Sequence, residues 1–297
     1  MKIIIPPEIE GKMLRDYLRS FPFISGGILT DLKKTGGITV NGEHVTVRYV
    51  LHEGDVLQVD YTDTEKGDIK PVFMPLDIVY EDENMTAVNK PSGMPTHPSH
   101  GHYEDTLANA LAYHYNDGSY IFRAVNRLDR CTSGIVLTAK NRLAAYALSD
   151  TMRRGGFCKT YYAICEGRPE PASGVISKNI KRAADSIIYR TVCGNTEGKS
   201  AVTEYETVKT FSFEGKLLSL VKLIPKTGRT HQLRVHMAYI GAPISGDCLY
   251  GSGEDGAAGD LALHAAELSF CDPFSGNNIK IKADLPKSWE RILKDNG

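Results

Sequence analysis

One short segment near the middle of the chain combines the residue types of an acid-dependent active site. Asp129 lies between Arg127 and Arg130, and a Thr-Ser-Gly turn at residues 132–134 leads into the apolar run 135–137. An acid held in a cationic loop beside a buried strand is expected to stay ionised. An ionised carboxylate suits a nucleophile or an electrostatic anchor better than a general acid. A structural ion pair would give the same pattern, so that alternative stays open here.

A second segment reads as a turn followed by a helix. Residues 226–237 run KTGRTHQLRVHM, so a turn that contains glycine leads into an amphipathic helix. Thr230 can cap this helix, and Leu233 and Met237 fall on one face at helical spacing. Arg229 directly precedes the expected helix start, which is a rigid position from which a guanidinium can reach a carboxylate.

The histidines of this second segment do not match a metal motif. His231 and His236 are five residues apart with no glutamate between them, unlike the i, i+4 pair of zinc-binding helices. The sequence also has no glycine-rich phosphate loop and no nucleotide-binding fingerprint. We therefore expect neither a metal site nor an organic cofactor.

Together the two segments resemble the motifs of the RluA-type (RluC- and RluD-like) pseudouridine synthase family. Residues 126–134 (NRLDRCTSG) resemble the family's HRLDxxTSG motif, and residues 227–236 (TGRTHQLRVH) resemble its TGRxHQ[IL]RxH motif. Three shorter matches are NKPSG at 89–93, KTY at 159–161 and LHA at 263–265. All five matches occur in the family's order, and the resemblance covers residues 77–290. Asn126 departs from the family's usual histidine, which leaves open what this position contacts in RNA.

The resemblance implies a reaction and three catalytic residues. The family breaks the bond from ribose C1′ to the uracil nitrogen, rotates the base and rejoins it through carbon 5, without a redox cofactor or an energy source. By resemblance, Asp129 supplies the carboxylate and Arg229 forms a salt bridge with it. Tyr161 stacks on the target base and takes part in removing the proton from carbon 5. Whether Asp129 attacks the sugar, attacks the ring or removes a 2′ proton stays open.

The resemblance also implies contacts to RNA around the cleft. The target uridine must leave its stack, at a cost of roughly a few kcal/mol. Arg127 is placed to fill the vacated position, and Asn126 is expected beside it. Lys90, His97 and Lys159 would meet phosphates. An RNA loop or bulge, where bases are already splayed, is the expected target.

The distribution of charge favours a polyanionic partner although the net charge is only −1. Residues 126–182 hold eleven Lys or Arg against four Asp or Glu, and residues 222–236 add four basic side chains and no acid. Positive charge thus gathers around the two motif segments, which favours a cleft for RNA. A solvated basic surface is the plainer alternative.

Residues 1–61 predict a small α+β domain. Residues 11–20 read as a helix, Ser25 can cap a second helix that Gly36 ends, and Asn41-Gly42 marks a hairpin. This arrangement resembles the αL-type RNA-binding domain, which commonly precedes RluA-type catalytic domains. Seven basic and eight acidic residues in 1–60 fit a generic small domain equally well. If the resemblance holds, the RNA face includes Arg15, Arg19, Lys33, Lys34 and Arg48.

The rest of the chain predicts a linker and a larger domain. Residues 62–76 begin with a polar stretch and read as the linker. Residues 77–297 are expected to form an α+β catalytic domain with a mixed, mainly antiparallel sheet and a central active-site cleft. Strands are expected at 78–80, 86–89, 134–138, 161–165, 186–192, 201–210 and 217–224, and helices at 106–115, 143–153, 230–240 and 289–294.

Bulk properties point to the cytoplasm. The 297-residue chain has 41% hydrophobic residues, no apolar run close to the roughly 18 residues of a membrane span, and no start typical of a signal peptide. Its six cysteines include no Cys-x-x-Cys pair, so we expect reduced, mostly buried thiols. We also expect a monomer.

These observations favour an RNA pseudouridine synthase, with large-subunit ribosomal RNA as the commonest substrate of the family and transfer RNA as the alternative. A catalytically silent RNA-binding or ribosome-assembly factor is a second hypothesis. A glycoside or nucleoside hydrolase is a third, but it would normally need a second carboxylate near Asp129, and neither motif segment supplies one.

Overall fold

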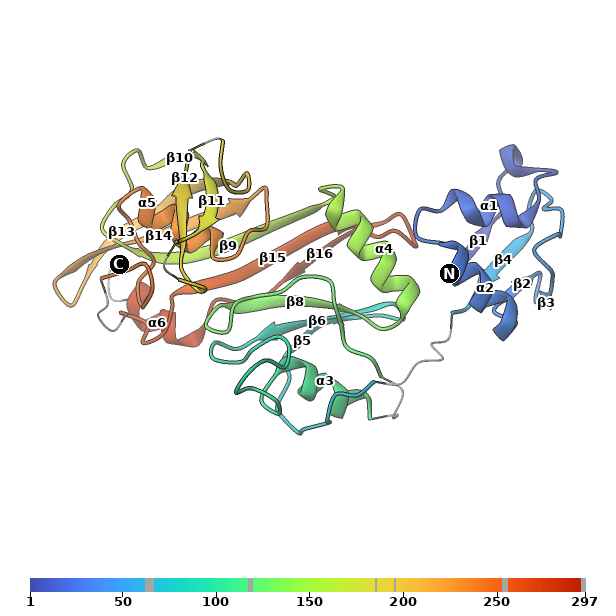
Figure 1. The fold of residues 1–297 in the computed structure, drawn as a ribbon, viewed down its shortest axis with the longest axis horizontal. Coiled ribbons are helices and arrows are strands. Elements are labelled where there is room, and N and C mark those ends of the chain that lie inside the picture. The colour runs from blue at the N-terminus through green and yellow to red at the C-terminus, as the bar shows by residue number, and fades with distance from the viewer. Residues whose placement is uncertain (62–66, 117–119, 185, 195, 253–255, 295–297) are drawn as a thin grey trace.

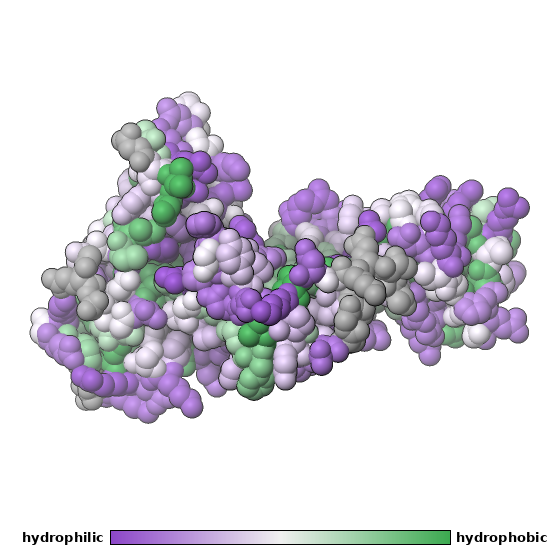
Figure 2. Space-filling view, turned by 60° about the horizontal axis from the view of Figure 1, so that its bottom comes forward, coloured by the Kyte–Doolittle hydropathy of each residue, from purple (hydrophilic) through white to green (hydrophobic). Residues whose placement is uncertain are grey.

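The computed structural model describes residues 1–61, 67–116, 120–184, 186–194, 196–252 and 256–294. Figure 1 shows an elongated molecule in which a small N-terminal body lies at one end of a larger body built on a long sheet. Hydrophilic side chains dominate the face of both bodies that Figure 2 shows. Among the described residues, no helix is long and apolar enough to cross a membrane.

The N-terminal body combines helices with a small sheet of strand order β1-β4-β2-β3. As predicted, the side chain of Ser25 caps the second helix, and Gly36 ends it in the left-handed conformation. Leu14 and Leu18 of the first helix and Leu32 of the second are fully buried. The elements are β1 (Lys2–Ile4), η1 (Pro7–Ile9), α1 (Leu14–Ser20), α2 (Gly26–Thr35), β2 (Ile38–Val40), β3 (Glu43–His44) and β4 (Val56–Val59).

The larger body is an α+β fold around a sheet whose main path runs β10-β13-β14-β9-β15-β8-β6-β5. Within the described residues, every recorded pairing in this sheet is antiparallel except that of β15 with β8. The predicted mixed, mainly antiparallel sheet is therefore confirmed. Its strands are β5 (Ile78–Glu81), β6 (Met85–Lys90), β7 (Arg123–Ala124), β8 (Ser133–Ala139), β9 (Phe157–Glu166), β10 (Ser173–Ser177), β13 (Val202–Phe213), β14 (Lys216–Pro225), β15 (Leu263–Cys271) and β16 (Asn278–Lys282).

Helices and one small hairpin complete this body. The hairpin forms a separate two-stranded sheet, β11-β12, which stands beside α5 (Gln232–Tyr239) in Figure 1. The remaining elements are α3 (Leu107–Tyr115), α4 (Arg142–Arg153), β11 (Asn179–Arg182), β12 (Arg190–Cys193), α5 (Gln232–Tyr239) and α6 (Lys287–Lys294).

The parallel pair of β8 and β15 depends on one glycine. Gly134 follows the Asp129 segment and has φ +109, a conformation that side chains other than glycine rarely adopt. A Cβ at this position would lie 2.3 Å from the carbonyl oxygen of Ala265. Only glycine lets the two backbones approach this closely, and the approach fixes where the Asp129 segment leaves the sheet.

The N-terminal body packs on α4 of the larger body, and Figure 1 shows it next to this helix. Leu143 and Ala147 of α4 are buried in the same apolar cluster as the N-terminal helices. The rings of Phe23 and Phe274 lie 5.6 Å apart at this contact, and Phe274 comes from the turn between β15 and β16. This contact between the two bodies is apolar at its centre.

Several expected elements differ from those observed. The strand expected at 186–192 forms only from Arg190, because the Ser186 Oγ accepts hydrogen bonds from the backbone N–H groups of Ile188 and Tyr189 and holds a turn. Of the expected linker, residues 62–66 lie outside the described residues. The prediction of mostly buried cysteines was wrong. Cys165 is buried, but three cysteines are exposed, namely Cys158, Cys248 and Cys271.

Candidate active site

A polar cleft of about 790 Å³ lies where the Asp129 segment meets β9 and the start of α5. Most of the residues that the sequence assigned to the catalytic domain line this cleft. They are His97, Asn126, Arg127, Asp129, Lys159, Tyr161 and Arg229. The assigned residues of the N-terminal body are exposed on that body: Arg15, Arg19, Lys33, Lys34 and Arg48.

The backbone of the Asp129 segment is held by hydrogen bonds to four consecutive carbonyl groups. Fixing the backbone in this way restricts where the Asp129 side chain can point. The Thr96 Oγ1 donates to the carbonyl of Leu128 (3.0 Å), and the Thr132 N–H donates to that of Asp129 (3.0 Å). The carbonyl of Arg130 accepts from the Lys90 Nζ (3.1 Å) and the Gly93 N–H (3.0 Å). The Ser92 Oγ donates to the carbonyl of Cys131 (2.9 Å).

Lys90 does not face RNA, so its predicted contact with phosphate was wrong. Its side chain is fully buried, and Nζ also donates to the carbonyls of Pro91 (2.8 Å) and Met94 (2.7 Å). Burial lowers the pKa of Lys90 to about 8, although the negative charge of Asp129 acts in the opposite direction. The ammonium instead ties the turn at residues 91–94 to the Asp129 segment.

Asn126 uses its side-chain amide to bind β8. Its Nδ2 donates to the carbonyl of Ile135 (3.0 Å), and its Oδ1 accepts from the N–H of Leu137 (2.8 Å). The residue therefore fixes the beginning of the catalytic segment to the sheet, a role that the sequence did not reveal. Any contact with RNA has to use the second hydrogen of the amide or the second lone pair of Oδ1.

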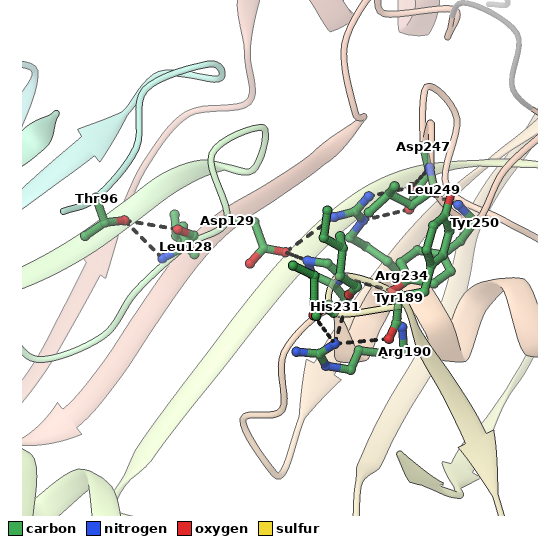
Figure 3. A network of polar contacts seen from close by, with 12 residues as sticks. Thr96, Leu128, Asp129, Tyr189, Arg190, His231, Arg234, Asp247, Leu249 and Tyr250 are labelled. Carbon is green, nitrogen blue, oxygen red and sulfur yellow. Dashed lines mark hydrogen bonds and ion pairs between the residues drawn. The ribbon is translucent and has the colours of Figure 1, made fainter. Parts of the chain in front are cut away.

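Asp129 is paired with Arg234 and faces His231 (Figure 3). Its Oδ2 lies 3.7 Å from Nη1 of Arg234 and 3.8 Å from Nε2 of His231. Arg234 also binds Asp247 in a bidentate manner, with Nε and Nη2 at 2.8 and 2.6 Å from the two carboxylate oxygens. The Asp247 side chain has 0% exposure, whereas that of Asp129 has 36%. Asp129 is thus the member of the chain Asp247–Arg234–Asp129 that a substrate can reach.

Burial and charge act in opposite directions on Arg234. Burial would lower the pKa of this guanidinium, but the hydrogen bonds and charge of Asp247, together with the charge of Asp129, outweigh it and raise the pKa. Arg234 therefore stays charged. One guanidinium between two carboxylates leaves a net negative charge, and this charge lies on the exposed end at Asp129.

The predicted salt bridge between Arg229 and Asp129 was wrong. The helix begins at Gln232 instead of Thr230, after His231 in a left-handed conformation (φ 57). The Gln232 Oε1 accepts from the Arg229 N–H (3.0 Å) and thereby fixes the turn. This turn directs the Arg229 Nε to the carbonyl of Ser200 (2.9 Å), while the first turn of α5 brings Arg234 to Asp129.

Tyr161 lines the cleft from β9, opposite Ala265 of β15. Burial and, to a smaller extent, the charge of Asp129 raise the pKa of its phenol. The phenol is therefore protonated at neutral pH and can donate a hydrogen bond. It can accept a proton only after its own proton has moved to another group.

The other assigned cleft residues carry positive charge or can acquire it. Burial, together with the nearby charge of Arg127, lowers the pKa of His97. The centre of its ring lies 4.8 Å from that of Phe122. Burial also lowers the pKa of Lys159. Among the described residues, no group of three or more His, Cys, Asp or Glu side chains is placed to hold a metal ion.

Comparison with known proteins agrees with the motif resemblance. The model of the RNA pseudouridylate synthase family matches residues 84–239, which run from the start of β6 to the end of α5. An uncharacterized RNA pseudouridine synthase of Bacillus subtilis, YjbO, is 41% identical over 277 residues, covering 91% of this chain and 95% of that protein. Ribosomal large subunit pseudouridine synthase D of Zymomonas mobilis is 32% identical over 277 residues, covering 88% and 86%.

A solved structure shares the fold as well. Human RNA pseudouridylate synthase domain containing 1 is 26% identical, with a TM-score of 0.61 over 78% of this chain and 97% of that chain. The similarity thus extends beyond the short motifs to most of the chain.

The buried ammonium of Lys90 generates a first prediction. Replacing it with methionine, Lys90→Met, keeps the volume but removes the donor to the carbonyls of Pro91 and Met94, and it leaves the Arg130 carbonyl with the Gly93 N–H alone. We expect the free energy of unfolding to fall by about 2–4 kcal/mol. Urea unfolding would measure the loss, with Lys12→Met on the exposed surface as the control, which should change stability by about 0.5 kcal/mol or less. Equal stability of the two variants would contradict an anchoring role for Lys90.

Proposed function

The chain belongs to the RluA-type RNA pseudouridine synthase family, and from this membership we propose that Asp129 is the group with which it isomerises uridine to pseudouridine. The supporting observation is the position of that carboxylate. It is the exposed end of a buried ion-pair chain, in a cleft lined by cationic side chains. Enzymes of this family are isomerases, so the site must break and re-form a bond to the same uracil.

The geometry of Asp129 fits this chemistry. The contacts of the carboxylate with Arg234 and His231 both use Oδ2, and Figure 3 shows the other oxygen directed away from these two residues. Oδ1 can therefore approach a nucleoside while Oδ2 stays bound. Attack on the sugar, attack on the ring and removal of a 2′ proton all need the carboxylate ionised, and each of these routes places its negative charge beside the guanidinium of Arg234.

Tyr161 is proposed to contact the flipped base. It lies on a strand of the sheet, so its ring has a fixed position at the cleft wall. Because its phenol is protonated, Tyr161 can take the proton from carbon 5 only if its own proton leaves first. Asp129 is a suitable acceptor when it is no longer bonded to the nucleoside, since its charge already acts on the phenol. The carbon 5 proton then passes to the Tyr161 oxygen while the isomerised nucleoside is still in the cleft.

A glycoside hydrolase of the usual two-carboxylate type is disfavoured by the second carboxylate of the site. Such enzymes need a second carboxyl group that reaches substrate or water. Asp247 has a side chain with 0% exposure, and both of its oxygens bind Arg234. It supports Arg234 and cannot act on a sugar.

We propose large-subunit ribosomal RNA as the substrate, with transfer RNA as the alternative. Support comes from relatives that are named ribosomal large subunit pseudouridine synthases, of which synthase D of Zymomonas mobilis is one. Arg127, His97 and Lys159 line the cleft and would receive the RNA strand. A cytoplasmic location and a monomeric state are further parts of this proposal.

We also propose that residues 1–61 bind RNA beside the target site. The basic side chains assigned to this role are exposed, and Lys33 and Lys34 lie in the last turn of α2. The apolar contact with α4 would keep this surface at a fixed position relative to the cleft. Such a surface adds affinity without contributing to the chemical step.

Loss of the carboxylate tests the catalytic assignment. Asp129→Asn should lower kcat about 10⁴-fold or more, because an amide cannot supply the anionic oxygen. RNA affinity should change less than about threefold, since the cationic cleft remains. Release of tritium from carbon 5 of uridine in a large-subunit ribosomal RNA transcript measures kcat, and filter binding measures affinity. Asp150→Asn on α4 is the control; a rate for Asp129→Asn as high as that of the control would exclude Asp129.

Charge reversal on the N-terminal body tests its RNA role without disturbing the contact with α4. The double variant Lys33→Glu, Lys34→Glu should weaken RNA binding about tenfold or more at low salt. Its kcat at saturating RNA should stay within about twofold. Reversal at two other exposed sites, Lys2→Glu and Lys12→Glu, provides a control with the same net charge. Equal affinities of the two double variants would show that the surface of α2 does not bind RNA.

A further inference from the structure

His231 faces the active carboxylate, but neither the motif resemblance nor the reaction assigns it a role. Its side chain is 13% exposed, and its Nε2 lies 3.8 Å from Oδ2 of Asp129. The backbone of His231 is left-handed (φ 57), a conformation that residues other than glycine adopt at a cost. A costly conformation that brings an imidazole to the active carboxylate suggests a function for this side chain.

The hydrogen bond between His231 and Tyr250 fits a neutral imidazole with its proton on Nε2. The Tyr250 hydroxyl oxygen accepts from the backbone N–H of Arg190 at 2.9 Å. The same hydroxyl lies 2.8 Å from Nδ1 of His231, so its own hydrogen can be donated there. A neutral imidazole that accepts at Nδ1 carries its proton on Nε2. That N–H group is on the side of the ring that faces Asp129 (Figure 3).

The surroundings keep the imidazole neutral. Burial lowers the pKa of His231, and the charges of Arg234 and Arg190 act in the same direction, against Asp129 and Asp247. The centre of the Tyr250 ring lies 5.6 Å from the centre of the His231 ring and 5.2 Å from Cζ of Arg234, so Tyr250 packs against both side chains. The imidazole therefore presents a neutral donor, whereas Arg234 presents the positive charge.

Two donors restrict the carboxylate more than one. An ion pair with Arg234 alone would leave Asp129 free to rotate and exchange its oxygens. A second donor from a different direction on the same oxygen opposes that rotation and keeps Oδ1 toward the cleft. The present separations of 3.7 and 3.8 Å exceed hydrogen-bond length, so a movement of roughly 1 Å would convert them into hydrogen bonds.

We propose that His231 is a positioning residue for Asp129, and that Tyr250 sets its tautomer through a relay that begins at the backbone of β12. This inference rests on the proposed function, because it assigns His231 a role in the orientation of the same carboxylate. The relay runs from the Arg190 N–H through the Tyr250 hydroxyl and the His231 ring to Oδ2 of Asp129.

Removal of the imidazole with chemical rescue tests the proposal. His231→Gly suits the left-handed backbone, so the variant should fold, and it leaves a space of imidazole size. We expect kcat for tritium release to fall about 10²-fold, with RNA affinity within about twofold of wild type. Added imidazole should raise the kcat of this variant at least tenfold. Added 1-methylimidazole should restore none, because its neutral form has no N–H group.

Two further variants separate positioning from a structural role. Tyr250→Phe removes the hydroxyl that sets the tautomer and should lower kcat about tenfold in wild type, but not in the His231→Gly background. His236→Gln alters a buried histidine of the same helix that binds Thr203 and Lys178, and it should leave kcat within about twofold.

The outcomes distinguish this inference from the proposed function. Wild-type kcat in His231→Gly, or equal rescue by imidazole and 1-methylimidazole, would overturn the role of His231 while wild-type activity stands. A wild-type enzyme that releases no tritium from either ribosomal or transfer RNA would instead reject the proposed function.

Discussion

The site depends on one guanidinium that is shared by two carboxylates. Arg234 binds the fully buried Asp247 through two short hydrogen bonds and reaches Asp129 with its remaining nitrogen. A buried ion pair of this kind adds little to stability, but loss of one partner leaves an uncompensated charge and costs about 3–5 kcal/mol. Asp247 therefore keeps Arg234 in place, and Arg234 in turn pairs with Asp129 at the cleft.

The sheet supplies the second constraint, because it fixes the backbone from which Asp129 projects. Gly134 lets β8 approach β15, and Lys90 and Ser92 hold the carbonyls just before that point. The side chain of Asn126 holds the other end of the segment to β8. A carboxylate on such a backbone loses little freedom when a nucleoside binds, which is the condition for efficient positioning.

Much of this arrangement could be predicted from the sequence. Residue spacing and turn signals indicated the N-terminal helices and the mainly antiparallel sheet, and the family resemblance implied the convergence of Asp129 and Tyr161 in one cleft. The choice between Arg229 and Arg234 could not be predicted, because it depends on where α5 begins. That start is decided by the side chain of Gln232 and by the left-handed His231, which local propensity does not reveal.

Strand alternation indicates that Lys90 is buried, but the charge of the side chain favours an exposed position. Along β6, Lys90 is two residues beyond the fully buried Val88, so strand alternation places both side chains on the same face. A lysine is rarely buried unless it has partners, and the carbonyls of Pro91, Met94 and Arg130 are contributed by segments far apart in the chain as well as by its neighbours. Sequence patterns cannot supply such partners.

Arg234, and not Arg229, is the arginine that pairs with the active carboxylate of Asp129. The most direct measurement compares kcat for pseudouridine formation in Arg234→Lys and Arg229→Lys at saturating RNA, after thermal unfolding has shown that both variants fold. Lysine keeps the charge but cannot bind Asp247 with two nitrogens and Asp129 with a third. We predict a loss of about 10²-fold for Arg234→Lys and of less than about threefold for Arg229→Lys. The reverse order would contradict this account.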